Sequence, residues 1–189
     1  MVDSTTWMVW EGVIPPEKCT ELVQKFYVES ESIDATVFDD EGSPEKKASV
    51  RQTRLCWDRD RNSELSKLLF DFGLAANSFG GWRLSLERLE DVQVAKYENS
   101  AFYNYHVDAY FGKVDQFGFQ RKLTAILLLS DPKTYVGGDF SFFTGEEVFM
   151  PKKQGTVIVF PGTTLHRVSP VTEGVRFSAT AWVGGAPFR

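Results

Sequence analysis

The second half of the chain carries its apolar residues in short runs that predict a β structure. Gly, Pro, Asp and Ser separate the runs, and these residues interrupt regular structure. Several short strands at such spacing are typical of a β-sandwich or barrel. The segments that we expect to form strands are residues 92–97, 122–130, 139–143, 156–160 and 176–184.

Two segments of the first half predict helices. Residues 15–30 open on two prolines, which suit the first turn of a helix. Three apolar residues of this segment then fall at helical spacing: Leu22, Val23 and Phe26. Residues 61–79 predict a second helix, with Asn62 or Ser63 as its N-cap.

The remaining segments of the first half predict two more strands, at residues 7–14 and 49–57. Residues 39–47 between them are polar, with Gly42 and Pro44, and predict a mobile loop. The expected fold is therefore α+β and mainly β. Two N-terminal helices would lie against one face of a jelly-roll barrel.

The chain length suits one domain. We expect a single domain over residues 1–189, with residues 1–91 as a helical support and substrate-loop region and residues 92–184 as the jelly-roll core.

The composition narrows the class of protein. Hydrophobic residues make up 42% of the chain and charged residues 25%, as in an ordinary globular protein. The net charge is −5 and no long basic run occurs, so we expect no nucleic-acid partner.

The cysteines and the apolar runs bear on the compartment. Cys19 and Cys56 lie far apart with no His close by, so we expect plain thiols in a reducing compartment. No run approaches the roughly 18 apolar residues of a membrane helix, and the N-terminus does not read as a signal peptide. The expectation is a cytoplasmic protein with no membrane partner.

The two histidines of the chain predict a metal site. His106 stands in YNYHVDAY, two residues before Asp108, and residues two apart on a strand project from the same face. His166 follows in PGTTLHRVSP, at the start of another expected strand. Two imidazoles and one carboxylate bind one divalent metal and leave positions open for other ligands, a geometry used by non-haem iron(II) oxygenases. His-x-Asp alone is weak support, because such a pair is common.

Arg176 stands ten residues after His166, on the last expected strand. If residues 171–174 form a turn, His166 lies opposite Thr180, and Arg176 lies roughly 13 Å further along at about 3.3 Å per residue. An arginine there suits a carboxylate, which its planar fork binds through two hydrogen bonds; a surface salt bridge is the alternative. One face of this strand is polar and would line a barrel interior: Arg176, Ser178, Thr180 and Trp182.

Four elements in order resemble the prolyl 4-hydroxylase-like Fe(II)/2-oxoglutarate-dependent dioxygenases, above all their small bacterial and viral members. They are VAKYENSAFYNYHVD, which contains Tyr97 and Tyr103, then RKLTAILLLS, GGDFSFF and FPGTTLHRVSPVTEGVRFSATAWV. The resemblance covers about half of the chain, from Val92 to Gly184. The first half is similar only weakly.

The resemblance implies a fold and an activity. The implied fold is a double-stranded β-helix. The implied cofactors are Fe(II), 2-oxoglutarate as co-substrate and O2, and the resemblance also implies a requirement for ascorbate. The activity is hydroxylation of an unactivated C–H bond, in a prolyl residue of a peptide or protein, with release of succinate and CO2.

The resemblance also assigns residues. His106, Asp108 and His166 would be the catalytic metal ligands, and Arg176 would bind the far carboxylate of 2-oxoglutarate. Some members bind the co-substrate through a tyrosine where this chain has Leu128. Tyr97 and Thr180 then become candidates for supplementary hydrogen bonds, or are packing residues.

Three alternatives stay open. The substrate could be a free amino acid or another small molecule. The chain could be a catalytically silent jelly-roll binding module, or a cupin-like metalloenzyme without 2-oxoglutarate. Residues 39–57, with Arg51 and Arg54, and residues 110–119 either close over the site or are surface connections.

Overall fold

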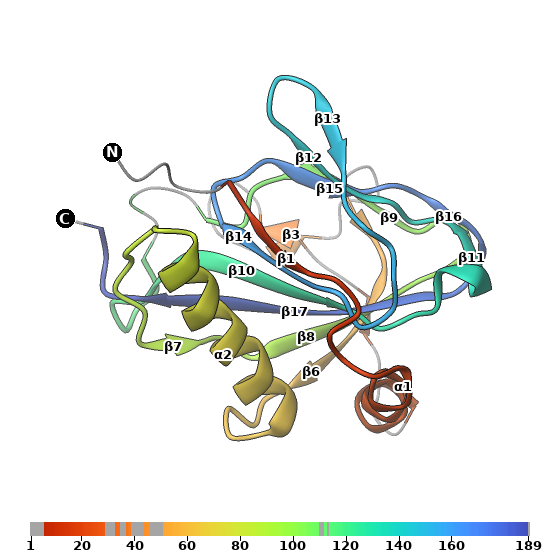
Figure 1. Ribbon diagram of the computed structural model, residues 1–189, viewed down its shortest axis with the longest axis horizontal. Helices are drawn as coiled ribbons and strands as arrows, with labels where there is room; N and C mark the ends of the chain where they lie inside the picture. Colours follow the sequence, from red (N-terminus) through yellow and green to blue (C-terminus); the bar gives the residue numbers. More distant parts are fainter. Residues whose placement is uncertain are drawn as a thin grey trace.

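Two antiparallel sheets dominate the computed structural model, which describes residues 6–28, 33–34, 37–38, 44–45, 51–109, 112 and 114–188 (Figure 1). The large sheet contains, in order, β1 (Met8–Trp10), β14 (Val157–Pro161), β10 (Gln120–Leu128), β17 (Arg176–Gly185), β8 (Val92–Tyr97), β6 (Arg54–Asp58) and β2 (Ile33–Asp34), with β7 (Arg88–Leu89) paired to β17. The small sheet contains, in order, β13 (Glu147–Phe149), β12 (Phe140–Phe143), β15 (His166–Val168), β9 (Phe102–His106) and β5 (Arg51–Gln52). The prediction of a mainly β fold is confirmed.

Two short hairpin-like pairs lie apart from these sheets. One joins β11 (Tyr135–Gly137) to β16 (Val171–Gly174), after the 3-10 turn Pro132–Thr134. The other joins β3 (Val37–Phe38) to β4 (Pro44–Glu45).

The helices are α1 (Pro16–Val23), which continues as a π-helical turn over Gln24–Val28, and α2 (Glu64–Phe79). Pro16 stands in the first turn of α1, where its missing N–H costs nothing. Ser63 is the N-cap of α2, and its hydroxyl accepts a hydrogen bond of 3.0 Å from the Ser66 amide. Both predicted helices are confirmed, although α1 gives way to the π turn after residue 23 and residues 29–30 lie outside the described part.

The large sheet has an apolar core on each of its two faces. The outer core packs α1 and α2 against it, through residues such as Leu22, Leu69 and Leu127. Figure 1 shows α2 lying across the strands on this side. The inner core lies between the two sheets and includes Ile126, Phe142 and Phe160. The expectation that both helices cover one face is confirmed.

The predicted strands of the second half agree with β8, β10, β12, β14 and β17, with ends that move by no more than two residues. Residues 49–57 differ from the prediction. This segment breaks at Thr53, so that β5 joins the small sheet and β6 joins the large one. The first half therefore contributes strands to both sheets. Of the loop expected at residues 39–47, only Pro44–Glu45 lie within the described residues.

The two cysteines, Cys19 and Cys56, are both buried. Burial raises the pKa of the Cys19 thiol to about 11. The thiol is therefore protonated near neutral pH, which fits the expectation of an unreactive cysteine.

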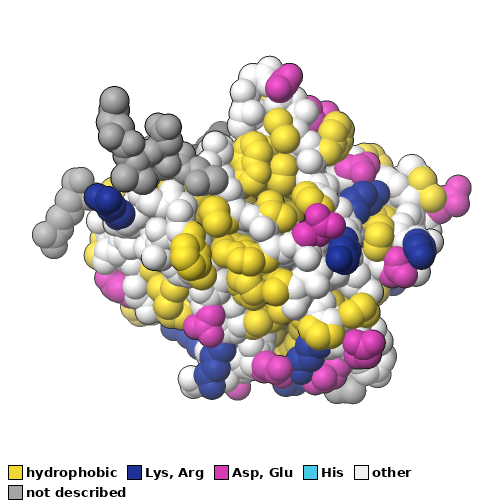
Figure 2. All heavy atoms as spheres, viewed as in Figure 1, with side chains coloured by type: hydrophobic (Ala, Val, Ile, Leu, Met, Phe, Trp, Pro, Cys, Tyr) yellow, Lys and Arg dark blue, Asp and Glu magenta, His cyan; other side chains and the backbone are white. Residues whose placement is uncertain are grey.

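The face seen in Figure 1 is apolar along β1 and β14, with acidic and basic side chains interspersed around this area (Figure 2). The β12–β13 hairpin adds two exposed rings, Phe143 and Phe149. Neither described helix combines the length and the apolar character that crossing a membrane requires.

Candidate metal centre

Three side chains from the small sheet meet at one end of the space between the sheets. His106 ends β9, Asp108 follows two residues later, and His166 begins β15 directly opposite His106. Asp108 lies 3.7 Å from His106 (Oδ1 to Nε2) and 3.4 Å from His166 (Oδ2 to Nε2). One ligand atom from each residue lies within 4.8 Å of the others, which is close enough to hold one metal ion.

Each imidazole is oriented by the same backbone contact. The Nδ1 atom of His106 lies 2.7 Å from the Asn104 carbonyl oxygen, and Nδ1 of His166 lies 2.8 Å from the Thr164 carbonyl oxygen. A carbonyl can only accept, so each Nδ1 carries the proton and each Nε2 presents a lone pair. Such second contacts fix the tautomer of metal-binding histidines.

Asp108 is fixed through its side chain and its backbone. The Thr124 hydroxyl, on β10 of the large sheet, donates a 2.7 Å hydrogen bond to Oδ2. The amides of Asp108 and Ala109 both donate to the Gly162 carbonyl, at 2.8 and 2.9 Å. A Cβ atom on Gly162 would lie 2.9 Å from that of Ala109, so only glycine allows this close approach.

The environment favours the charge states that a metal needs. Burial, and then the neighbouring His166 ring, lowers the pKa of His106 to about 3, so this ring is neutral near pH 7. Burial raises the pKa of Asp108, but the two imidazoles, Arg121 and the Thr124 hydroxyl lower it by more, and the carboxylate is ionised. Neutral imidazole and carboxylate are the forms that coordinate metals.

A pocket that is partly open to solvent extends from the triad between the two sheets. The large sheet lines it with the polar face of β17, as predicted from the alternation of that strand. The lining residues from the large sheet are Gln93, Tyr97, Ile126, Arg176, Ser178, Thr180 and Trp182. Those from the small sheet and its ends are Arg51, Tyr103, His106, Asp108, Phe140, His166 and Val168.

Arg176 is 2% exposed and lies beside Tyr97, its cross-strand neighbour on β8. Its guanidinium carbon is 5.2 Å from the centre of the Tyr97 ring, and its Nη1 donates a 3.2 Å hydrogen bond to the Ser178 hydroxyl. Gly138, at a φ of +62°, packs against its stem, where a Cβ atom would lie 2.7 Å from Arg176 Cδ. The surface salt bridge weighed for Arg176 is excluded by its burial.

The register expected for His166 is wrong. Residues 171–174 are not a turn but strand β16, which pairs with β11. The chain then enters the large sheet, where Thr180 lies opposite Gln93 and Ile126 rather than His166. The sheet pairing therefore gives no support to the distance inferred from a His166–Thr180 pair.

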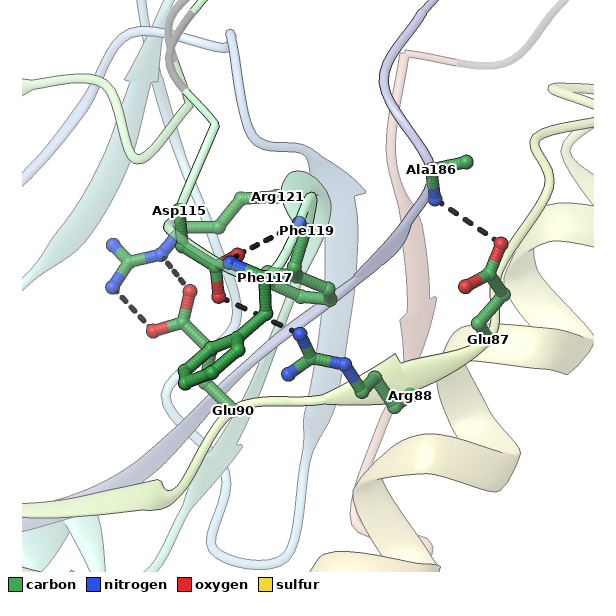
Figure 3. Close-up of polar contacts among 8 residues, drawn as sticks. All are labelled: Glu87, Arg88, Glu90, Asp115, Phe117, Phe119, Arg121 and Ala186. Atoms are coloured by element: carbon green, nitrogen blue, oxygen red, sulfur yellow. Dashed lines mark hydrogen bonds and ion pairs between the residues drawn. The ribbon is translucent and has the colours of Figure 1, made fainter.

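Arg121 braces the triad from the large sheet. Its guanidinium forks onto the Glu90 carboxylate at 2.7 and 2.6 Å, as Figure 3 shows, and stacks 3.9 Å from the Trp182 ring centre. Its Nη1 also lies 3.5 Å from the Asp108 carbonyl oxygen. No local sequence signal marks this residue, because its role depends on a carboxylate 31 positions away.

Residues 110–119 are the second segment that either closes over the site or is a surface connection, and its described part is held in a tight turn (Figure 3). The Asp115 carboxylate accepts hydrogen bonds of 2.8 Å from the amides of Phe117 and Phe119. These bonds, the Phe119 amide first, lower the pKa of Asp115. Phe117 at this turn is 78% exposed. Residues 110, 111 and 113 lie outside the described part.

The substrate-loop prediction for residues 39–57 is only partly tested. Arg51 lines the cavity, whereas Arg54 is exposed and is not among the lining residues. Leu128 is buried in the inner core away from the cavity lining, while Tyr97 and Thr180 both line it. Whether Tyr97 and Thr180 bind a co-substrate stays a prediction.

The fold and the site together define a class: a β protein with a mononuclear metal centre built from two histidines and one aspartate. Residues 92–184 match the model of the 2OG-Fe(II) oxygenase superfamily. This region is similar to that superfamily, whose cofactors are iron(II) and 2-oxoglutarate. The resemblance seen in the motifs is confirmed.

Individual proteins of known family are also similar to this region. PKHD-type hydroxylase YbiX from Shigella boydii and from Escherichia coli is 37% identical over 92 residues, which are 47% of this chain and 40% of the relative. The match thus spans less than half the length of these curated relatives.

Solved structures share the fold over nearly the whole chain. The viral collagen prolyl hydroxylase of Paramecium Bursaria Chlorella virus-1 superposes with a TM-score of 0.73 at 20% identity, covering 97% of this chain and 98% of that one. A Pseudomonas putida prolyl-4-hydroxylase superposes with a TM-score of 0.68 at 22% identity, covering 95% and 92%.

Proposed function

We propose that the chain is an Fe(II)- and 2-oxoglutarate-dependent dioxygenase that hydroxylates an unactivated C–H bond and releases succinate and CO2. The observation that carries the proposal is the shared cavity of the triad and Arg176. The triad presents two imidazoles and one carboxylate, a set that fits iron(II) and leaves positions open. Arg176 presents a buried cation to the same space, as a dicarboxylate requires.

Each residue of the site has a separate role in this proposal. His106, Asp108 and His166 would hold the iron, and the carbonyls of Asn104 and Thr164 keep the two rings turned toward it. Iron with 2-oxoglutarate and O2 supplies the oxidising chemistry when bound. The chain itself provides orientation and shields the site from water, and no side chain is needed as a general base.

Arg176 would bind the far carboxylate of 2-oxoglutarate. Its guanidinium already lies beside Tyr97 and bonds Ser178, so its position is set before a ligand arrives. Tyr97 and Thr180 are supplementary contacts in this proposal, since both line the cavity.

The substrate we propose is a prolyl residue of a peptide or protein. Support comes from two structural neighbours that are described as prolyl hydroxylases. A third neighbour, from Trichoplax adhaerens, was solved with a peptide fragment of a hypoxia-inducible factor; it has a TM-score of 0.67 at 12% identity. A free amino acid or other small molecule is the second candidate, favoured by the burial of the cavity residues.

The strand order supports the finer fold assignment, a double-stranded β-helix. Along the chain β8, β9, β10 and β12 alternate between the large and the small sheet, and β14, β15 and β17 do the same. Such alternation is what two turns of a β-helix produce.

The test is anaerobic addition of iron(II) and 2-oxoglutarate to the metal-free protein. We expect a visible iron-to-keto-acid charge-transfer band that disappears on exposure to oxygen, with succinate formed. His166→Ala should keep the fold, measured by circular dichroism, and lose succinate formation, because one of three ligands is gone. No band in folded protein that has taken up metal would favour a silent binding module, and undiminished succinate from His166→Ala would refute the iron assignment.

A further inference from the structure

Arg51 is a second buried cation in the cavity, and the proposed function gives it no role. It stands on β5 at the edge of the small sheet, opposite Tyr103. Its side chain crosses toward the large sheet, where Nη1 donates a 3.3 Å hydrogen bond to the Gln93 side chain. The residue is 7% exposed, so the charge is held away from water.

Two of the three nitrogens of the Arg51 guanidinium have no acceptor among the described residues. Among the described residues, only three buried side-chain nitrogens have no hydrogen-bond partner, and all three belong to residues lining this cavity: Arg51 Nε, Arg51 Nη2 and Trp182 Nε1. A buried donor without a partner costs about 1–3 kcal/mol, and more when it is charged. The Tyr103 ring, 4.4 Å away, offers a cation–π contact but no lone pair in the plane of the guanidinium.

Arg51 and Arg176 occupy different positions in the cavity. Arg51 contacts Gln93, and Arg176 lies beside Tyr97, four residues further along β8. Four residues of strand span about 13 Å at roughly 3.3 Å each. This spacing separates the backbone positions of Gln93 and Tyr97, so the two arginines contact different residues of the large sheet.

Arg51 also lies close to the metal centre. The Tyr103 ring that it contacts is stacked on the His106 ring, with 3.4 Å between ring centres. The Tyr103 ring therefore lies between Arg51 and His106, and a group held by Arg51 would share the cavity with the triad at the distance of about one aromatic ring.

The charges of the lining residues indicate what is missing. Asp108 is the only acidic residue among them, against Arg51 and Arg176. The two positive charges of a divalent metal balance the two negative charges of 2-oxoglutarate. The negative charge of Asp108 likewise balances the positive charge of Arg176. The charge of Arg51 remains, and a buried charge needs a partner of opposite sign.

We propose that Arg51 binds a carboxylate of the primary substrate, which is therefore an acid whose carboxylate enters the same cavity as the carbon that is hydroxylated. This assignment rests on the proposed function. It narrows the proposed substrate to a residue that carries a free carboxylate: a C-terminal prolyl residue of a peptide or, for the second candidate, a free amino acid. Arg51 is thus a specificity-determining residue.

The experiment uses the full chain with Mn(II) and 2-oxoglutarate, which fill the metal site and the Arg176 position without turnover. The probes are matched acids and primary amides: acetate and acetamide, N-acetylglycine and its amide, and N-acetyl-L-proline and its amide. Relaxation of the probe protons by Mn(II) reports binding near the metal. We expect the acids, but not the amides, to be relaxed.

Arg51→Gln should weaken binding of the acids at least about tenfold, the loss expected for one charge-assisted hydrogen bond. Arg51→Lys keeps the charge and should bind them with intermediate strength. Arg54→Gln is the matched control, because Arg54 lies on the next strand, is exposed and does not line the cavity. It should behave as the unaltered protein.

Three results would overturn the assignment: equal relaxation of acids and amides, unaltered acid binding in both Arg51 variants, or no acid binding by protein that holds 2-oxoglutarate. Protein that takes up Mn(II) but not 2-oxoglutarate would overturn the proposed function as well. The thermal unfolding midpoint distinguishes a structural role of Arg51 from a ligand-binding role. If the guanidinium is needed for packing, Arg51→Gln lowers the midpoint; if it serves only to bind a ligand, the midpoint does not fall.

Discussion

Replacing Arg176 by glutamine removes the buried cation that we assign to the far carboxylate of 2-oxoglutarate. The guanidinium can give that carboxylate two charge-assisted hydrogen bonds, each contributing about 1.5–3 kcal/mol. Their loss predicts a dissociation constant for 2-oxoglutarate that rises about 10²- to 10⁴-fold. Metal affinity should stay nearly unchanged, because Arg176 is not one of the three candidate ligands.

The assay is an anaerobic titration of the iron(II)-loaded protein with 2-oxoglutarate, followed by the charge-transfer band, with a separate Mn(II) titration for the metal site. Arg167→Gln is the control, since Arg167 pairs with Glu147 and does not line the cavity. Circular dichroism verifies the fold of Arg176→Gln, whose shorter side chain leaves space in the inner core. An unaltered dissociation constant in the folded Arg176 variant would refute the assignment, and an equal loss in Arg167→Gln would show an unspecific charge effect.

Three further predictions follow from contacts around the cavity. Thr124→Val removes the hydroxyl that bonds Asp108 Oδ2, so Mn(II) affinity should fall about 10- to 100-fold, as for other lost second contacts; an equal affinity would contradict it. Gly138→Ala would place a methyl group 2.7 Å from Arg176 Cδ on backbone at a positive φ, so the 2-oxoglutarate dissociation constant should rise while Mn(II) binding persists. The pKa of His106 is about 3 in the folded chain and about 6.5 when unfolded, so the unfolded state takes up the extra proton first. The free energy of unfolding of the metal-free protein should therefore fall as the pH drops from 6.5 toward 3, by at most about 1.4 kcal/mol per pH unit, and urea titrations of the protein and of His106→Gln should show a shallower slope in the variant.

The sequence was most informative where one residue decides one local property. The polar face of β17 follows from alternation alone, and the structure places all four of its residues at the cavity. Asn62 and Ser63 were the two candidate caps, and Ser63 caps α2. His106 and Asp108 were paired by spacing, and they lie together.

The errors arose where pairing depends on distant partners. Residues 171–174 carry Thr, Glu and Gly and resemble a turn, but β11 offers them a strand to pair with. Residues 49–57 form a continuous β pattern, yet the two sheets compete for them and the segment divides at Thr53. Neither partner can be identified from the local sequence, because strand pairing is a property of the assembled sheet.

Arg51 illustrates the same limit for the site. In the sequence it stands beside a polar loop, and Arg54 three residues later is an equal candidate. The side on which each side chain lies depends on the break at Thr53, which directs Arg51 to the cavity and leaves Arg54 in solvent. Only the three-dimensional structure distinguishes the two.

The two cores on opposite faces of the large sheet determine which substitutions the chain can accept independently of one another. On β17 the residues Phe177, Ala179, Ala181 and Val183 pack toward the helices, and the residues between them face the cavity. Neighbouring residues of one strand thus meet unrelated requirements: one set packs against the helices, and the other determines which ligand binds. A mutational library restricted to the cavity-facing positions of this strand can change the cavity while leaving the helix-packing face untouched. A library at the helix-facing positions can change thermal stability without altering which molecule binds.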